Sequence, residues 1–124
     1  WEFEKFPGDP RYKLDILMEA TRPGNLCAEL DLAWAYTGGV DPAAYIRKYK
    51  GRCPMVHAKD VIKARDGKKQ QLVPLGQGDL NWTEIFKAGD EAGIEWYIYE
   101  QDNGQGSPFD YTQASYAFLS KHMR

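Results

Sequence analysis

The feature that most constrains the fold of this chain is a regular alternation of short apolar runs with amphipathic helical patterns. The apolar runs are rich in residues that favour strands, and the segments between them place apolar side chains three or four residues apart, as in a helix. The predicted strands are residues 1–3, 26–34, 54–58 and 94–101, with helices at residues 13–21, 43–50 and 81–93 and a last helix after residue 110. Strands that alternate with helices in this way pair in parallel through right-handed crossovers. The predicted fold is therefore α/β, built of parallel βα repeats.

Helix boundary signals support this assignment. Asp41 is a predicted N-cap, followed by a proline at the first helical position, and Gly51 is placed to end that helix. Asn81 and Glu84 have the spacing of a capping box, and Gly93 ends the helix that they begin. These positions predict two helices with defined ends.

Two further local signals concern the connections. Residues 61–79 are long for a link between a strand and a helix, and Asp66-Gly67 within them predicts the tight turn of a small hairpin. Asp110 and Gln113 are predicted to cap the last helix.

Length and charge exclude several classes of protein. The chain has 124 residues, which corresponds to a single domain, and its net charge is −2. This charge provides no basic surface for nucleic acid, and no apolar run approaches the ~20 residues that a membrane span needs. The sequence also lacks the glycine-rich phosphate-binding motifs of nucleotide-binding folds. We expect neither a nucleic-acid nor a membrane partner.

The cysteines and two tryptophans are interpreted structurally. Two cysteines, Cys27 and Cys53, suit a reducing compartment better than a disulfide framework, so a cytoplasmic location is expected. Both lie in or beside apolar runs and are expected to be unreactive thiols in or near the core. Trp82 and Trp96 are expected to serve packing, since the first lies on a helical stripe and the second begins a strand.

Polar residues with metal-binding potential stand at the ends of three predicted strands. They are Asp31, His57 and Glu100. In parallel α/β folds the carboxyl ends of the strands meet on one face, where ligands bind. Two carboxylates and an imidazole predict a divalent-metal site there, and the donor set suits Mn²⁺, Zn²⁺, Fe²⁺, Co²⁺ or Mg²⁺.

Each of these residues also has a simpler interpretation. A histidine within an apolar strand is often a core residue with satisfied hydrogen bonds, and Asp31 has the character of a turn cap. Glu100 is a natural partner for Lys59, and Lys59 in turn fits a surface ion pair with Asp60 or Glu100. The coincidence of three polar residues at three strand ends favours the metal site over three independent structural roles.

Longer stretches of the sequence resemble a known family. They are "DLAWAYTGGVDPAAYIRKYKGRCPMVHAKD", "VPLGQGDLNWTEIFKAGDEAG" and "WYIYEQD". Together they resemble the C-terminal half of sugar phosphate isomerase/epimerase proteins, which are xylose isomerase-like TIM barrels. The resemblance runs from Trp1 to His122, so residues 1–124 are expected to form one C-terminal half-barrel segment, about half of a (β/α)8 barrel.

The resemblance implies a reaction and assigns residues to it. It implies that Asp31, His57 and Glu100 bind a divalent metal, Mn²⁺ first among those named, and that Glu100 is also the catalytic acid–base group. The reaction implied is the isomerisation or epimerisation of a sugar or sugar phosphate by proton transfer next to a carbonyl, through an enediolate.

Other residues are expected to contact the substrate. Trp34 would pack against a sugar ring or close the pocket, and Lys59 would face an anionic or hydroxyl oxygen. Gln101 and Asp102 directly follow the strand end and would be within reach of the substrate. Residues 61–79 would act as a lid.

The chain departs from the family pattern in two places. Many members have a histidine three residues after the strand-end aspartate, where this chain has Trp34. In close relatives a His-Asn-His motif precedes a strand end like Glu2-Phe3, and the first metal ligand belongs there. We therefore expect weak metal binding and no activity unless a partner supplies that ligand. An open half-barrel also exposes a sheet edge and its inner face, so we expect self-association or a complementary N-terminal half-barrel.

Other functions stay open from the sequence alone. If the chain keeps the metal-binding residues but catalyses no reaction, it would be a non-catalytic association module. Alternatively, it would belong to a dehydratase branch of the same superfamily. An apurinic-site endonuclease fits less well, because such enzymes use more histidines and a basic DNA-facing surface. Whether the isolated chain is an enzyme is not decided by its sequence.

Overall fold

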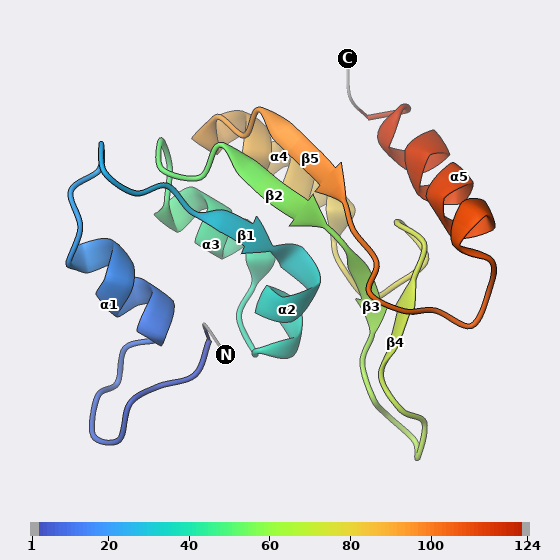
Figure 1. Ribbon diagram of the computed structural model, residues 1–124, viewed down its shortest axis with the longest axis horizontal. Helices are drawn as coiled ribbons and strands as arrows, with labels where there is room; N and C mark the ends of the chain where they lie inside the picture. Colours follow the sequence, from blue (N-terminus) through green and yellow to red (C-terminus); the bar gives the residue numbers. More distant parts are fainter. Residues whose placement is uncertain (1–2, 123–124) are drawn as a thin grey trace.

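The computed structural model describes residues 3–122 (Figure 1). Helices and strands do not alternate one by one as predicted, because two helices follow the first strand and two hairpin strands follow the second. Helices α1 and α5 lie at opposite ends of the molecule (Figure 1). In chain order the elements are α1 (Lys13–Glu19), β1 (Glu29–Asp31), α2 (Leu32–Thr37), α3 (Pro42–Lys48), β2 (Met55–Ala58), β3 (Asp60–Ile62), β4 (Gln71–Val73), α4 (Trp82–Ala92), β5 (Trp96–Tyr99) and α5 (Pro108–Leu119). None of the described helices is both long enough and apolar enough to cross a membrane.

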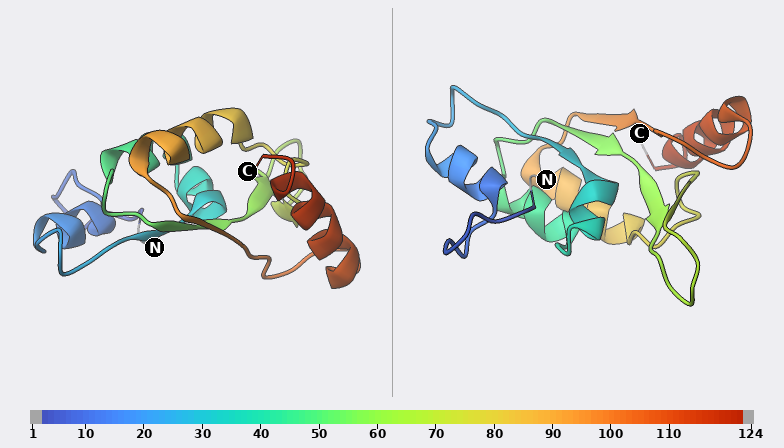
Figure 2. Two further views of the ribbon diagram at one scale, coloured as in Figure 1. Left: turned by 90° about the horizontal axis from the view of Figure 1, so that it is seen from above. Right: turned by 60° about the horizontal axis from the view of Figure 1, so that its bottom comes forward.

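The main sheet has three parallel strands in the order β1-β2-β5, as the alternation predicts. The central strand β2 places His57 beside Asp31 of β1 on one side and beside Ile98 of β5 on the other. Helices α3 and α4 lie on the same side of this sheet (Figure 2, left). The other face is therefore free to carry polar groups.

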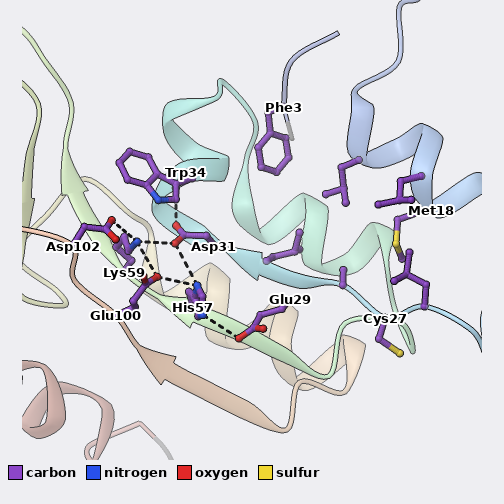
Figure 3. Close-up of a pocket in the computed structure, with 15 residues that line it drawn as sticks. Phe3, Met18, Cys27, Glu29, Asp31, Trp34, His57, Lys59, Glu100 and Asp102 are labelled. Carbon is purple, nitrogen blue, oxygen red and sulfur yellow. Dashed lines mark hydrogen bonds and ion pairs between the residues drawn. The ribbon is translucent and has the colours of Figure 1, made fainter. Parts of the chain in front are cut away.

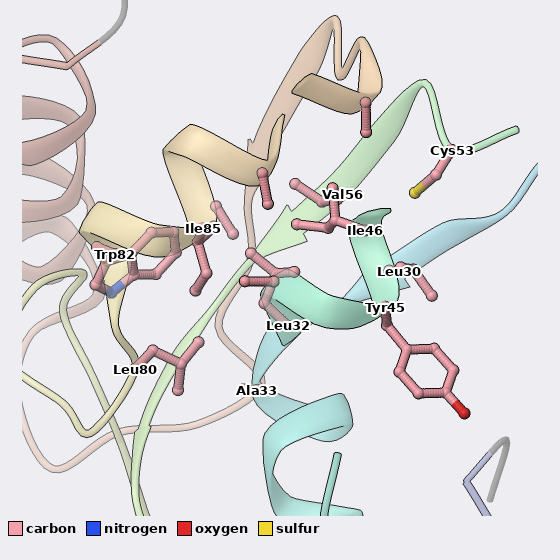
Figure 4. Close-up of a cluster of buried hydrophobic side chains, with 14 of the residues drawn as sticks. Leu30, Leu32, Ala33, Tyr45, Ile46, Cys53, Val56, Leu80, Trp82 and Ile85 are labelled. Atoms are coloured by element: carbon pink, nitrogen blue, oxygen red, sulfur yellow. The ribbon is translucent and has the colours of Figure 1, made fainter. Parts of the chain in front are cut away.

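The hydrophobic core lies between the sheet and helices α3 and α4 (Figure 4). Leu30 lies between Glu29 and Asp31, and Val56 lies between Met55 and His57. Leu30 and Val56 face the helices, and their strand neighbours face the opposite side. Ile46 of α3 and Ile85 of α4 are fully buried against them. Burying a side chain of this size contributes about 1.5–3 kcal/mol. The strand alternation thus decides which residues are available for a site.

The predicted N-caps are confirmed at α3 and α4, and the predicted C-terminal end is confirmed at α4. The Asp41 side chain accepts a hydrogen bond from the backbone N–H of Ala43 at 3.0 Å, and Asn81 accepts from the N–H of Glu84 at 3.3 Å. Gly93 has φ +84°, the left-handed conformation that glycine adopts at the end of a helix. Gly51 also has a positive φ, +74°, but α3 ends earlier than predicted, at Lys48 with Tyr49 as its C-cap.

Other predicted elements differ from the structure. The predicted strand at residues 26–34 is shortened to Glu29–Asp31 because the Asp31 side chain caps a helix that begins at the next residue. The last helix begins at Pro108 after Ser107, so Asp110 lies in its first turn and does not cap it. Of the first predicted strand, residues 1 and 2 are outside the described residues and Phe3 lies in a turn.

The predicted hairpin is confirmed. Strands β3 and β4 pair antiparallel, and an isolated bridge between Arg65 and Lys68 brackets the turn. Asp66 and Gly67 both have positive φ, +51° and +76°, the combination that a tight two-residue hairpin turn requires.

Two packing predictions are wrong in part. Trp82 is buried as predicted, but Trp96 is 61% exposed because it lies on the open face of β5, away from the helices. Cys53 is buried, and burial raises the pKa of its thiol to about 11. Cys27 is exposed, because it lies before the start of β1.

Candidate active site

Asp31, His57 and Glu100 lie together near the ends of β1, β2 and β5: Asp31 ends β1, His57 precedes the last residue of β2 and Glu100 follows β5 (Figure 3). The Nδ1 atom of His57 is 2.9 Å from Oε2 of Glu100 and 3.6 Å from Oδ2 of Asp31. One ligand atom from each residue lies within 4.8 Å of the others. The parallel register produces this grouping, since it aligns the three strand ends.

The two oxygens of Asp31 have different partners. Oδ1 accepts a hydrogen bond from the backbone N–H of Trp34 at 2.9 Å and caps α2. Oδ2 faces the cluster, 3.0 Å from the ammonium of Lys59. Burial raises the pKa of Asp31, an effect that these two hydrogen bonds only partly offset. Asp31 thus fulfils both interpretations of its sequence position, as a cap and as a member of the cluster.

Lys59 is the buried cation of the site. Its side chain is 1% exposed, and its ammonium lies 3.0 Å from Asp31, 2.9 Å from Glu100 and 2.7 Å from Asp102. Burial alone lowers the pKa of Lys59, but these hydrogen bonds outweigh it and raise the pKa above its usual value. The ammonium also lies 5.1 Å from the centroid of the Trp34 ring. Lys59 is therefore a buried ammonium held by three carboxylates.

Glu29 is a member of the cluster that the sequence reasoning missed. Its Oε1 lies 3.0 Å from Nε2 of His57, on the ring nitrogen that does not face Glu100 (Figure 3). The signal was present in the sequence, because residues two apart on a strand share a face, and Glu29 stands two residues before Asp31. Glu29 and Glu100 together hold both nitrogens of the imidazole.

Asp60 does not pair with Lys59, so the surface ion pair between them is a wrong interpretation. The buried carboxylate of Asp60 instead accepts hydrogen bonds from the backbone N–H groups of Val61, Gly76, Gly78 and Leu80 and from Nε1 of Trp82. Glycine is required at position 78 because a Cβ there would lie 2.1 Å from Oδ1 of Asp60. Asp60 thereby ties the start of β3 to the segment that leads into α4.

A cavity of about 400 Å³ connects the polar cluster with an apolar region. Trp34 lines it beside Asp31 and His57, and Leu14 and Leu26 line its apolar end. None of the described residues 61–79 lines this cavity, so the predicted lid lies away from the cluster in this structure.

Gln101 lies in a neighbouring cavity of about 350 Å³, which Asp102 shares. There Tyr99 donates a hydrogen bond to Oε1 of Gln101 at 2.6 Å, and Nε2 of Gln101 donates to the carbonyl of Asn103 at 3.0 Å. Both ends of the side chain are thus occupied within the chain. The substrate role of Gln101 stays a prediction.

The donor set of the cluster fits a divalent cation. Four carboxylates face one imidazole and one ammonium, so negative charge remains in excess when the imidazole is neutral. Such an excess of oxygen donors beside a histidine nitrogen favours cations of the Mg²⁺, Mn²⁺ and Zn²⁺ type without selecting among them. The carboxylates concerned are Glu29, Asp31, Glu100 and Asp102.

The fold and the strand-end cluster agree with the family that the sequence matches. The family described as Xylose isomerase-like TIM barrel matches residues 9–122. The chain belongs to this family, and its parallel sheet with flanking helices is part of a TIM barrel. The resemblance inferred from the sequence is confirmed.

Several known proteins are similar to the chain over most of its length. An inosose dehydratase of Geobacillus thermodenitrificans (strain NG80-2) is 32% identical over 80% of this chain and 39% of its own length. An inosose dehydratase of Clostridium tetani (strain Massachusetts / E88) is 31% identical with the same coverage. The crystal structure of a sugar phosphate isomerase/epimerase from Parabacteroides distasonis ATCC 8503 superposes with a TM-score of 0.74 at 28% identity, covering 94% of this chain and 38% of that one. The chain thus spans about two fifths of the length of these relatives.

Proposed function

We propose that residues 1–124 form the C-terminal half-barrel of a metal-dependent enzyme that removes a proton next to the carbonyl of a polyhydroxylated substrate. The observation that carries this proposal is the grouping of Asp31, His57 and Glu100 within 4.8 Å at three strand ends, beside a buried ammonium. Parallel barrels place their catalytic groups at this end of the strands. A sugar-like substrate and a cytoplasmic location are parts of the same proposal.

Asp31, His57 and Glu100 are the residues that would hold the metal, with Mn²⁺ as the first candidate and Zn²⁺, Co²⁺, Fe²⁺ and Mg²⁺ as alternatives. When bound, a divalent cation polarises a carbonyl oxygen and stabilises negative charge on it. Glu29 supports this set by accepting the other ring N–H of His57, which fixes the side of the ring that faces the ligands.

The side chains of the cluster divide the chemistry between them. Glu100 would accept the proton as the carbon–hydrogen bond breaks, and the electron pair would move to form an enediolate. The ammonium of Lys59 would face the oxygen on which negative charge develops, since it is buried within the cluster of carboxylates. Trp34, which is 39% exposed at the wall of the cavity, would pack against the substrate ring.

Two outcomes follow from the same first step. Return of the proton to the neighbouring carbon, or to the other face of the same carbon, gives isomerisation or epimerisation. Breakage of a carbon–oxygen bond on the next carbon would give dehydration, with the leaving hydroxyl taking the proton that Glu100 had accepted and departing as water. Dehydration is the second candidate because two relatives at 31% and 32% identity are inosose dehydratases.

The exposed face of β5 supports the half-barrel proposal. Trp96 and Ile98, which are 61% and 41% exposed, stand on the face of the sheet that carries the cluster. A large apolar side chain beside an open strand edge is typical of a surface that another element covers. A complementary N-terminal half-barrel, or a second copy of the chain, is the proposed partner.

Exchange of substrate protons with solvent tests the first step directly. The chain, purified together with the proposed N-terminal half-barrel, is incubated with Mn²⁺ in D₂O with an inosose, a ketose or a ketose phosphate, and loss of the proton next to the carbonyl is followed by NMR. Exchange is expected in the wild type and lost in Glu100→Gln, whereas Glu95→Gln, an exposed residue before β5, keeps it. Loss of one water from the product identifies dehydration, and deuterium incorporation without it identifies isomerisation or epimerisation. Exchange that persists in Glu100→Gln would contradict the assigned base.

A further inference from the structure

Lys59 shares its acceptor atoms with the proposed metal site. Its ammonium lies 3.0 Å from Oδ2 of Asp31 and 2.9 Å from Oε2 of Glu100. These same two oxygens face Nδ1 of His57, at 3.6 Å and 2.9 Å. A metal that binds Nδ1 of His57 together with these two oxygens would therefore compete with Lys59 for them.

The surroundings of Lys59 prevent the ammonium from simply leaving the site. The side chain is 1% exposed, and the Trp34 ring covers it at 5.1 Å. The third acceptor, Oδ2 of Asp102 at 2.7 Å, lies outside the metal-ligand set and is the shortest of its three contacts. If the ammonium of Lys59 moves toward Asp102, it can leave Asp31 and Glu100 free for a metal and still keep a charged partner.

We propose that Lys59 is a built-in competitor that weakens metal binding, and that Asp102 holds its ammonium when a metal takes the shared oxygens. The inference rests on the proposed function, because it needs a metal at Asp31, His57 and Glu100. Its physical basis is repulsion between two cations a few ångströms apart together with competition for the same lone pairs. The pair Lys59–Asp102 thereby sets the affinity of the site, and a metal binds there more weakly than the number of carboxylates alone would allow.

Replacement of Lys59 by methionine tests the competition. Methionine keeps much of the buried volume and removes the charge. Mn²⁺ alone is titrated into purified protein, and the electron paramagnetic resonance signal of free Mn²⁺ gives the bound fraction. Lys59→Met is expected to bind Mn²⁺ at least about tenfold more tightly than the wild type. Lys63→Met removes an equal charge from a lysine whose ammonium lies 4.0 Å from the centroid of the Tyr36 ring, and it is expected to leave the affinity unchanged.

Asp102→Asn provides a second variant that keeps the lysine. Loss of the Asp102 carboxylate leaves Lys59 with only Asp31 and Glu100 as charged acceptors, and it removes one negative charge near the metal. Mn²⁺ affinity is therefore expected to fall several-fold. Circular dichroism establishes that each variant is folded before it is titrated. Unchanged Mn²⁺ affinity in whichever of the two variants folds would overturn the inference.

Thermal unfolding separates this role from a purely structural one. Without Mn²⁺, Lys59→Met is expected to unfold at a lower temperature than the wild type, because three carboxylates lose their shared cation. With excess Mn²⁺ the difference is expected to shrink or reverse, since tighter binding adds more stability. A constant difference with and without Mn²⁺ would contradict the inference. Absence of Mn²⁺ binding in both wild type and Lys59→Met would instead contradict the proposed metal site itself.

Discussion

Nε2 of His57 lies 3.0 Å from Oε1 of Glu29, while Nδ1 of the same ring faces Glu100 at 2.9 Å. The two contacts give the imidazole one orientation, with a carboxylate outside the metal-ligand set holding its far nitrogen. Histidines that bind metals are commonly held in this way. Glu29 is therefore a positioning residue for the proposed ligand His57.

Removal of Glu29 is expected to weaken metal binding. Glu29→Ala leaves Nε2 of His57 without its carboxylate, so Mn²⁺ affinity should fall about tenfold or more. Glu29→Gln keeps an oxygen acceptor and should recover part of the loss. Titration with Mn²⁺ measures both variants, and Glu95→Gln is the control for loss of an exposed carboxylate. Equal affinity in Glu29→Ala and the wild type would rule out the positioning role.

Asp60 is expected to be the most sensitive polar residue outside the cluster. Asp60→Ala leaves five buried or half-buried N–H groups without their acceptor, so the free energy of unfolding should fall by about 3 kcal/mol or more. Trp82→Phe removes only one of these hydrogen bonds and should cost about 1 kcal/mol beyond the change in packing. Urea unfolding measures both. Asp66→Asn is the control, because asparagine also tolerates its positive φ.

Asp15 is expected to make stability depend on acid pH. Burial pushes the pKa of Asp15 up, but Lys48, Tyr49 and Tyr45 outweigh burial and hold the pKa below 3.8. The folded state therefore favours the ionised form. This contribution is present above the unfolded pKa near 3.8 and is lost as pH falls through the lower folded pKa.

Asp15→Asn tests this dependence. The variant should be less stable than the wild type at neutral pH, because the ion pair of Asp15 with Lys48 at 2.6 Å is lost. The difference in the free energy of unfolding should shrink as the pH is lowered below about 3.8. Urea unfolding at a series of pH values measures it. A difference that stays constant down to the lowest pH would show that ionised Asp15 contributes nothing.

The two thiols are expected to react at very different rates. Cys27 is exposed, whereas Cys53 is buried with a pKa raised to about 11, so little thiolate forms there at pH 8. A thiol reagent such as Ellman's reagent should modify one cysteine quickly in the native protein and the second only after unfolding. Cys27→Ser should abolish the fast reaction. A fast reaction that survives this substitution would place Cys53 within reach of solvent.

The parts of the fold that local chemistry determines could be predicted from the sequence. Asp41, Asn81 and Gly93 have side chains or backbone preferences that act within a few residues, and each lies where it was predicted. The extent of β1 was not predictable in this way, because the apolar run continues into α2 and only the Asp31 cap separates them. The exposure of Trp96 depends on which strands lie beside β5. A run of β-favouring residues does not determine that arrangement.

The candidate site was predictable to the extent that it follows from strand order. Asp31, His57 and Glu100 were predicted to meet because parallel strand ends converge, and the structure brings them together. The pairing of Lys59 with Glu100 was among the interpretations and is present, but the burial of Lys59 between three carboxylates was not predicted, because it depends on side chains from two other strand ends. A long side chain next to a predicted ligand can point to solvent or inward, and only the packing around it decides.

The most direct test of the metal assignment is anomalous diffraction from crystals of the protein soaked in Mn²⁺. A peak is expected between the side chains of Asp31, His57 and Glu100, and it should disappear in crystals of His57→Ala grown and soaked in the same way. Absence of a peak at this position in the wild type, or a peak that persists unchanged in His57→Ala, would contradict the assignment.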